Sequence, residues 1–452
     1  MINFLAKKII TQPPFSVTRE LRIPQFMQKL LQQLDTKFHY RALALSDSFL
    51  ADEWRVLQLY KLKKILTHAG KNVVFWKRIF KENGFDSKRL KDFDELKNLP
   101  VVSRAYLKSV PREDFMASNI SKIRWVTAST SGSTSEPFSF FNDSRDIFRR
   151  RMNVFLELRH AGLSGAGRAL VLGLGTLKGL RHYPLHVEPQ EFESRERRVG
   201  RIYPLLNYHK PEILFSTPSY LRRFAHHCRT DGFNYIFKCI RFYGEAMELD
   251  ERDELENFFG CGIYSTYGSH ECSVIGIECV NRNMHTVPWL NYVEIVDDKG
   301  IRVPDGETGN IVVTFFENEC MPFIRYKIGD RGQILKEKCV CGRNSLLLKF
   351  DGRVLGFLEF QDGSVYQVSH IANHLAEKFS DLIRRFQLEQ PEPANIIFRY
   401  IPQKQNERIL IESRLNNYFN SSIGDKVKIE YKAVDYIRPD TRGKTKVFIK
   451  NF

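Results

Sequence analysis

The spacing of apolar residues changes along this chain. Residues 62–69 carry apolar side chains at helical spacing, and residues 92–99 have the pattern of a short helix that ends before Pro100. From about residue 124 to residue 316, apolar runs typical of buried strands alternate with helical patterns. The predicted strands here are 169–172, 213–215, 240–243, 292–296 and 310–316, and the predicted helices are 218–229 and 250–259. Strands that alternate with helices predict a layered α/β domain.

The last hundred residues have a different pattern. Beyond Asp351-Gly-Arg353, predicted strands at 395–400 and 427–431 accompany a helix near 369–378, which is the content of a small α+β domain. A chain of 452 residues is too long for one compact core. We therefore expect three parts: 1–120, the helical part of a large domain; 121–351, its α/β core; and 352–452, a small C-terminal domain.

Composition and charge exclude several classes of protein. The chain is 42% hydrophobic and 27% charged, as in ordinary globular proteins, and no apolar run is long enough to span a bilayer. Met1–Ile10 has neither the apolar length nor the cleavage site of a signal peptide, so at most a peripheral membrane contact is expected there. The net charge of +16 is spread along the chain, which favours anionic ligands such as nucleotides or CoA over a specific nucleic acid.

All 8 cysteines lie between Cys228 and Cys341. A secreted disulfide scaffold would distribute its cysteines more evenly in a much shorter chain, so a cytoplasmic protein is expected.

A loop rich in small hydroxyl residues, Thr127–Pro137, lies between a predicted strand at 123–126 and an apolar run at 138–141. Its hydroxyls and backbone N–H groups suit a polyphosphate. By itself, the loop is equally compatible with an ordinary Ser/Thr turn.

Four segments behind this loop complete a candidate nucleotide site. Residues 243–246 directly follow a predicted strand, at the carboxyl end where open α/β sheets bind ligands. Residues 264–271 contain a glycine that permits close approach and end in a glutamate suited to Mg²⁺. Residues 324–330 end in an aspartate that can accept hydrogen bonds from ribose, and residues 438–444 place a lysine on a glycine turn. Each segment alone also fits a cap, a turn or a solvated side chain.

In this order, the segments resemble those of the AMP-forming adenylate synthetase superfamily of acyl-CoA ligases. The chain is most similar to the branch of phenylacetate–CoA ligase and the CapK-type proteins of capsular polysaccharide loci, which residues 62–76, 99–103 and 215–220 also match. The resemblance covers nearly the whole chain. It implies an α/β fold: a large layered α/β N-terminal domain of the adenylate-forming type with a small mobile α+β C-terminal domain.

The resemblance also implies a role for each matched residue. The ATP phosphates would be held by Thr130, Ser131, Gly132, Ser133 and Thr134. The adenine would be lined by Gly244, Glu245 and Ala246, with Tyr267 stacked near the base. Glu271 would hold Mg²⁺, and Asp330 would bind the ribose, with Arg353 nearby. The implied catalytic residues are Lys444, which would bridge the carboxylate and the α-phosphate, Glu271 and Thr134. The acyl substrate is expected near Tyr243, Tyr267, Ser219 and His270.

Two segments depart from the family pattern. Ser135-Glu136 stand where the phosphate loop usually has Gly-Lys, and Val354-Leu355 follow Gly-Arg where an Asp is usual. An acidic side chain close to a triphosphate repels it unless the side chain points away.

A second set of residues predicts a metal site. Cys279 and His285 lie near one strand, and Cys339 and Cys341 lie in a tight glycine turn. Three sulfurs and one nitrogen suit a tetrahedral structural Zn²⁺. Similar elements in relatives of this branch support the interpretation, and four buried residues that never meet are the alternative.

These observations predict an enzyme that activates a carboxylic acid with ATP as an acyl-adenylate, releases pyrophosphate, and transfers the acyl group to the thiol of CoA or a carrier protein. Modification of a surface polysaccharide is an expectation of the CapK resemblance alone. The alternatives are an enzyme of the same fold that acylates an amine or a sugar, and a non-catalytic, zinc-stabilised basic binding protein. A P-loop NTPase is excluded because no Gly-Lys-Ser/Thr ends the loop. The acid and the oligomeric state are not specified by the sequence.

Overall fold

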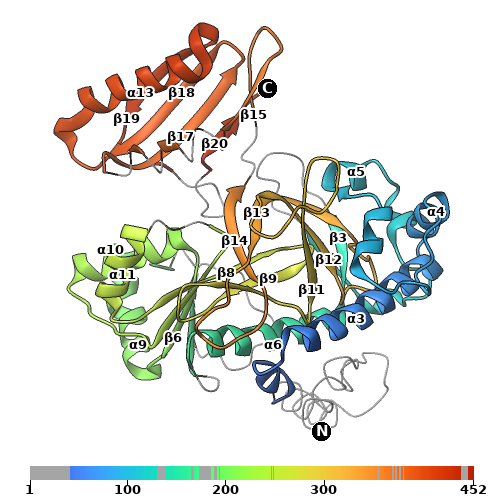
Figure 1. The fold of residues 1–452 in the computed structure, drawn as a ribbon. Helices are drawn as coiled ribbons and strands as arrows, with labels where there is room; N and C mark the ends of the chain where they lie inside the picture. The colour runs from blue at the N-terminus through green and yellow to red at the C-terminus, as the bar shows by residue number, and fades with distance from the viewer. Residues whose placement is uncertain are drawn as a thin grey trace. The chain divides into compact units, whose positions relative to one another are not determined.

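The structure is a computed structural model that describes most of the chain. The described residues are 41–129, 139–163, 167–172, 185–187, 191–192, 194–245, 247, 249–353, 357–368, 371, 374–375, 378–379, 381–438 and 446–452. They form two compact units, one that ends at Asp351 and one that begins at Gly352 (Figure 1).

Helices form the first part of the larger unit. α3 (Ala51–Asn72) begins where the Glu53 carboxylate accepts a hydrogen bond from the Leu50 N–H. α4 (Val74–Glu82) follows directly. The predicted helix near 92–99 is a 3₁₀ helix, η1 (Phe93–Asn98), capped by the Asp92 side chain. Shorter elements follow: β1 (Val102–Ser103), α5 (Arg104–Lys108), η2 (Arg112–Phe115) and η3 (Lys122–Arg124).

A large sheet forms the centre of this unit. Its strand order is β11-β12-β13-β14-β10-β9-β8-β7-β6-β4-β5, with β1 paired to β13. The parallel part contains β4 (Ala169–Leu172), β5 (Leu185–Val187), β6 (Ile213–Ser216), β7 (Cys239–Tyr243) and β8 (Ile263–Ser269). The rest contains β9 (Ser273–Glu278), β10 (Met284–Thr286), β11 (Asn291–Val296), β12 (Gly309–Phe315), β13 (Tyr326–Leu335) and β14 (Leu347–Arg353). A separate hairpin pairs β2 (Trp125–Ser129) with β3 (Ser139–Asp143).

Helices cover both faces of the parallel strands. Alternate residues of a strand point to opposite faces, so Leu170 and Leu214 share one face and Ala169 and Ile213 the other. The first face packs against α9 (Tyr203–His209), α10 (Pro218–Asp231) and α11 (Leu249–Phe259). The second face packs against α6 (Ser144–His160). This two-sided cover confirms the predicted α/β class.

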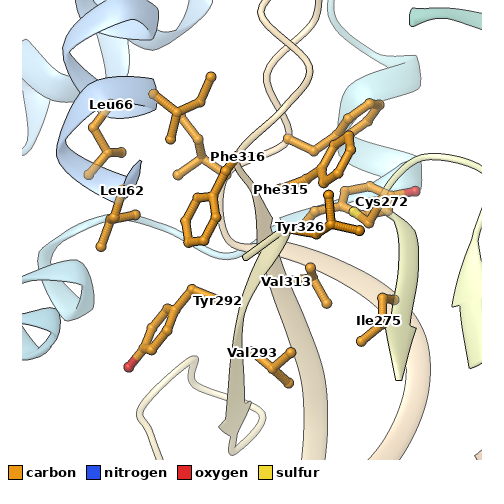
Figure 2. Close-up of a cluster of buried hydrophobic side chains, with 14 of the residues drawn as sticks. Leu62, Leu66, Cys272, Ile275, Tyr292, Val293, Val313, Phe315, Phe316 and Tyr326 are labelled. Carbon is orange, nitrogen blue, oxygen red and sulfur yellow. The ribbon is translucent and has the colours of Figure 1, made fainter. Parts of the chain in front are cut away.

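The largest core joins the N-terminal helices to the sheet. Leu62 and Leu66 of α3 belong to the same buried cluster as Tyr292 and Val313 of β11 and β12 (Figure 2). Buried polar contacts join the same elements: Lys61 is ion-paired with Glu317, and the Trp76 indole N–H donates to the Pro322 carbonyl over 3.0 Å. Residues far apart in sequence therefore share one core.

The smaller unit has its own core. Its four-stranded sheet has the order β19-β18-β17-β20, formed by β17 (Ile383–Glu392), β18 (Asn395–Pro402), β19 (Lys428–Ala433) and β20 (Phe448–Lys450). α13 (Arg408–Ile423) packs on it through Ile411, Leu415 and Phe419. A hairpin of β15 (Phe357–Glu359) and β16 (Val365–Gln367) completes the described strands. Among the described residues of the whole chain, no helix combines the length and apolarity needed to cross a membrane.

Candidate nucleotide site and a cysteine–histidine cluster

The carboxyl end of β7 carries the first predicted adenine segment. Gly244 follows Tyr243 with φ of 75°, in the left-handed region that glycine adopts without strain. The Glu245 carboxylate lies 3.6 Å from an Arg222 guanidinium nitrogen of α10. The chain therefore turns sharply here and leaves its backbone at the end of a parallel strand, where open sheets bind ligands. Ala246 lies outside the described residues.

Two of the predicted segments meet at a hydrogen bond. The Tyr267 hydroxyl, on β8, donates to Asp330 Oδ2, on β13, over 2.7 Å. The Tyr267 ring also packs on Phe350 at 4.9 Å between centroids. A Cβ on the next residue, Gly268, would lie 2.3 Å from the Ser273 carbonyl oxygen, so only glycine fits this bend. The structure thus brings together a ring and a carboxylate from segments 63 residues apart.

Glu271 is buried and held on one side. Its Oε1 accepts hydrogen bonds from Arg104 Nη2 at 2.9 Å and from the Tyr326 hydroxyl at 2.8 Å. Burial and the Glu271 carboxylate raise the pKa of the Tyr326 hydroxyl, which therefore stays protonated and donates. No hydrogen bond from a described residue reaches Oε2 of Glu271. The carboxylate is thus fixed in orientation with one oxygen available, which fits the hard oxygen ligand that Mg²⁺ prefers.

Two residues without a predicted role, Glu157 and Arg241, lie beneath the end of β7. The Tyr243 hydroxyl donates to Glu157 Oε2, on α6. Glu157 is enclosed, and its burial raises the pKa of its carboxyl despite the opposing effect of Arg241. Arg241 is fully buried and donates to the backbone carbonyls of Glu278 and Ser265. Tyr243, predicted to face the substrate, thus has its hydroxyl committed to Glu157.

The remaining predicted residues are placed only in part. His270 is exposed in the turn after β8. Ser219 lies in the first turn of α10, and Arg353 is the last residue of β14. The phosphate loop residues, Thr130, Ser131, Gly132, Ser133 and Thr134, lie outside the described residues, as does Lys444.

The four predicted zinc ligands lie together. Single ligand atoms of Cys279, His285, Cys339 and Cys341 all fall within 4.8 Å of one another. The Cys279 and Cys339 sulfurs are 3.6 Å apart, and Cys341 Sγ is 3.3 Å from His285 Nε2. The other ring nitrogen of His285 lies 3.2 Å from the Ser345 hydroxyl. The alternative in which these residues never meet is therefore excluded.

The distances within this cluster fit a tetrahedral metal site. Zinc bonds of about 2.3 Å to sulfur and about 2.0 Å to nitrogen place neighbouring ligand atoms about 3.5 to 3.8 Å apart. Burial opposes ionisation of Cys339, but hydrogen bonds from the Cys341 backbone N–H and the Asn283 side chain lower the pKa of its thiol, whereas burial raises the pKa of the neighbouring Cys279 thiol to about 12. Burial lowers the pKa of His285 to about 4, so its imidazole is neutral, as a metal ligand must be. A thiolate and a neutral imidazole are the forms that bind zinc.

Segments of the chain match two families of known proteins. Residues 187–314 match the family described as AMP-binding enzyme, and residues 358–451 match the CapK C-terminal domain. The chain is 28% identical to a phenylacetate-coenzyme A ligase of Thermus thermophilus over 342 residues, which are 68% of this chain and 70% of that protein. It is 21% identical to protein CapK of Staphylococcus aureus over 421 residues, which are 87% and 89% of the two chains.

Solved structures show the same fold. A crystal structure of 2-hydroxyisobutyryl-CoA ligase, in the postadenylation state with R3-HIB-AMP, superposes with a TM-score of 0.70 and 21% identity. The superposition covers 89% of this chain and 90% of the other. The large layered domain and the small C-terminal domain therefore have the fold that this ligase has.

Proposed function

Because segments of this chain match the AMP-binding enzyme family and the CapK C-terminal domain, and because the chain is similar to phenylacetate-coenzyme A ligases and to CapK, we propose that the residues around the ends of β7 and β8 bind ATP and activate a carboxylic acid. The observation that carries the proposal is the Tyr267–Asp330 hydrogen bond. It joins two predicted nucleotide segments beside the sharp turn at Gly244.

We propose a distinct role for each of these groups. The Gly244–Glu245 backbone lines the adenine, and Tyr267 packs near the base. Asp330 accepts hydrogen bonds from the ribose hydroxyls, with Arg353 nearby, and Tyr267 holds its other oxygen. The carboxylate is oriented in advance, so binding ATP costs little side-chain entropy. The phosphates are assigned to the hydroxyl loop Thr130–Thr134.

The activation step requires two anions to meet. An oxygen of the substrate carboxylate attacks the α-phosphorus of ATP, the bond to the bridging oxygen breaks, and pyrophosphate leaves. Lys444 is proposed to contact both the carboxylate and the α-phosphate, which lowers their repulsion. Glu271 is proposed to hold Mg²⁺ through Oε2, because Arg104 and Tyr326 both occupy Oε1. That ion would supply further charge compensation at the phosphates.

The second step transfers the acyl group to a thiol. The sulfur attacks the carbonyl carbon of the adenylate, AMP leaves with the electrons of the broken C–O bond, and the thiol proton passes to solvent. CoA is the acceptor of acyl-CoA ligases. A carrier protein is a further candidate, and an amine or a sugar hydroxyl would use the same adenylate. A surface polysaccharide is proposed as the eventual destination of the acyl group on the resemblance to CapK-type proteins alone; the chain is 21% identical to one of them along 87% of its length.

We propose that Cys279, His285, Cys339 and Cys341 hold a structural Zn²⁺. A closed set of four protein ligands leaves no position for a substrate, which is typical of a structural site. The ion would fasten the turn at 339–342 to the end of β9.

Acid-dependent release of pyrophosphate tests the enzyme assignment. The purified chain is incubated with ATP, Mg²⁺ and a panel of aryl, short-chain, hydroxy and amino acids. We expect release with one class of acid, loss of release in Lys444→Ala, and unchanged ATP affinity in that variant. Lys446→Ala, two residues away, is the matched control and should keep its activity. Equal activity of wild type and Lys444→Ala would overturn the role of Lys444. If none of the acids in the panel causes release of pyrophosphate, the proposed function is overturned.

A further inference from the structure

The buried face of α6 carries a polar stripe. Residues advance by about 100° per position in a helix, so Asn153, Glu157 and His160 share one face. All three are buried, with 2%, 2% and 6% of their surface exposed. Apolar residues flank the stripe: Met152 and Leu156 belong to the largest core, while Val154 and Leu158 pack with β4 and β6. Burying polar groups on a helix face costs free energy unless each of them finds a hydrogen-bond partner.

Two members of the stripe have partners that place α6 on the sheet. His160 Nδ1 lies 2.8 Å from the Leu156 carbonyl, and the His160 carbonyl accepts from the Val280 N–H, just beyond β9. Glu157 accepts from Tyr243, the last residue of β7. Because β9 runs antiparallel to β8, Val280, which follows the end of β9, lies near the amino ends of the parallel strands. From His160 to Glu157, α6 therefore advances toward the carboxyl ends of those strands.

Asn153 lies one helical turn farther in the same direction. Four residues span about 6 Å along a helix, which places Asn153 beyond Glu157, on the side where β7 gives way to Gly244. Neither Oδ1 nor Nδ2 of Asn153 has a hydrogen-bond partner among the described residues. An enclosed carboxamide without partners destabilises a fold, so its presence beside a ligand site indicates that a ligand satisfies it.

We propose that Asn153 is a specificity-determining residue that hydrogen-bonds a neutral polar group on the acyl chain, and that the substrate is consequently a carboxylic acid bearing a hydroxyl or similar group. This inference rests on the proposed function. A carboxamide both donates and accepts, and a hydroxyl does the same, so the two match. A second carboxylate on the substrate is disfavoured because Glu157 lies one turn away on the same face. A purely hydrocarbon acyl chain would leave the carboxamide unsatisfied.

Matched pairs of acids test the inference. Pyrophosphate release is measured for lactate and propionate, 3-hydroxybutyrate and butyrate, and 4-hydroxyphenylacetate and phenylacetate. In at least one pair we expect the hydroxylated acid to have the higher kcat/KM, by about 10- to 100-fold for one satisfied buried hydrogen bond. Asn153→Leu should bring that ratio close to one. A wild type that releases pyrophosphate but prefers no hydroxylated acid overturns the inference and leaves the proposed function standing.

A thermal readout separates a ligand-binding role from a structural one without any activity. Asn318 is the matched control, because it is also fully buried but has partners: its Nδ2 donates to the Phe141 carbonyl at 2.9 Å and its Oδ1 accepts from the Met321 N–H at 3.2 Å. Asn318→Leu should lower the unfolding temperature. Asn153→Leu should leave it unchanged or raise it, since a group without partners is replaced by an apolar one. An equal fall in both variants would assign Asn153 to the core and overturn the inference.

Discussion

Removal of the proposed zinc ion should destabilise the larger unit by several kcal/mol. The perturbation is the variant Cys339→Ser, which removes one of four ligands, or a chelator added to the wild type. Cys339 is the most informative ligand because it lies within 3.6 Å of Cys279 and accepts a hydrogen bond from Asn283 at 3.3 Å. Its side chain is nearly buried, so a serine there changes little except the ligand chemistry.

The magnitude follows from the loop that the metal closes. Cys279 and Cys339 are 60 residues apart in sequence. Closing a loop of about 60 residues removes conformational entropy from the unfolded chain that corresponds to about 4 kcal/mol at 25 °C. Residual zinc binding to the unfolded chain would reduce this figure, so about 2 to 4 kcal/mol is expected. For a unit of this size, such a loss lowers the unfolding temperature by roughly 3 to 6 °C.

Metal content and thermal unfolding measure the effect together. The purified wild type should contain one equivalent of zinc, and Cys339→Ser should contain much less. Cys261→Ser is the control, because Cys261 is partly buried but is not among the four clustered residues. That control should keep both the zinc and the unfolding temperature.

Two results would refute this reasoning. The first is a wild type that contains no zinc after purification without chelators and takes up none when zinc is added. The second is a zinc-containing protein whose unfolding temperature is the same with and without a chelator that removes the ion completely. In the second case, the sheet contacts of β9, β10 and β14 would hold the segment without help from the metal.

Two further predictions concern single hydrogen-bonded groups. Tyr267→Phe removes the 2.7 Å hydrogen bond to Asp330 but keeps the ring contact with Phe350, so we expect KM for ATP to rise about fivefold, equivalent to about 1 kcal/mol, with little change in unfolding temperature. Hydrogen bonds from Arg198, opposed in part by burial, lower the pKa of Asp231 to about 2, below its ordinary 3.8. That carboxylate therefore stabilises the fold by about 2 kcal/mol above pH 4 and loses this contribution as the pH falls toward 2. Urea unfolding should show Asp231→Asn about 2 kcal/mol less stable than wild type at pH 7, with the difference shrinking between pH 4 and pH 2; a constant difference would contradict the assignment.

The parallel part of the sheet could be predicted well from the sequence. The strands predicted at 169–172, 213–215 and 240–243 are β4, β6 and β7, because each is a short apolar run buried on both faces. The meeting of the four zinc-type residues could also be predicted, since two short segments that each carry two metal-ligand side chains are typical of one shared site. The segment predicted as a strand from residue 123 begins as the 3₁₀ helix η3, and β2 starts at Trp125.

The burial of the polar residues of α6 could not be predicted, for a physical reason. Apolar residues at 152, 154, 156 and 158 imitate the alternation of a strand, and the polar side chains of Asn153 and Glu157 between them suggest a solvated face. In the structure, two different cores flank the helix, so both apolar rows and the polar row between them are buried. A single sequence does not reveal that a helix is covered from two sides.

The hydrogen-bond partners of Glu271 could not be predicted from the sequence either. The motif at 264–271 predicted that its carboxylate is a candidate metal ligand, but its partner Arg104 lies 167 residues earlier in the chain. Only the fold of β1 and α5 against β13 brings that guanidinium to it. Contacts of this kind depend on the topology of the chain, which local sequence patterns do not predict.

The core shared by α3 and the later strands has a consequence for synthesis in the cell. Lys61 can pair with Glu317 only after a further 256 residues have been synthesised. The face of α3 around Leu62 and Leu66 likewise packs against strands that lie beyond residue 290. At ordinary translation rates of 5 to 20 residues per second, this interval is roughly 10 to 50 s. During that time the nascent chain presents an unpaired apolar helix to its surroundings. The large unit therefore folds late on the ribosome, and its yield should depend on chaperones that shield early helices.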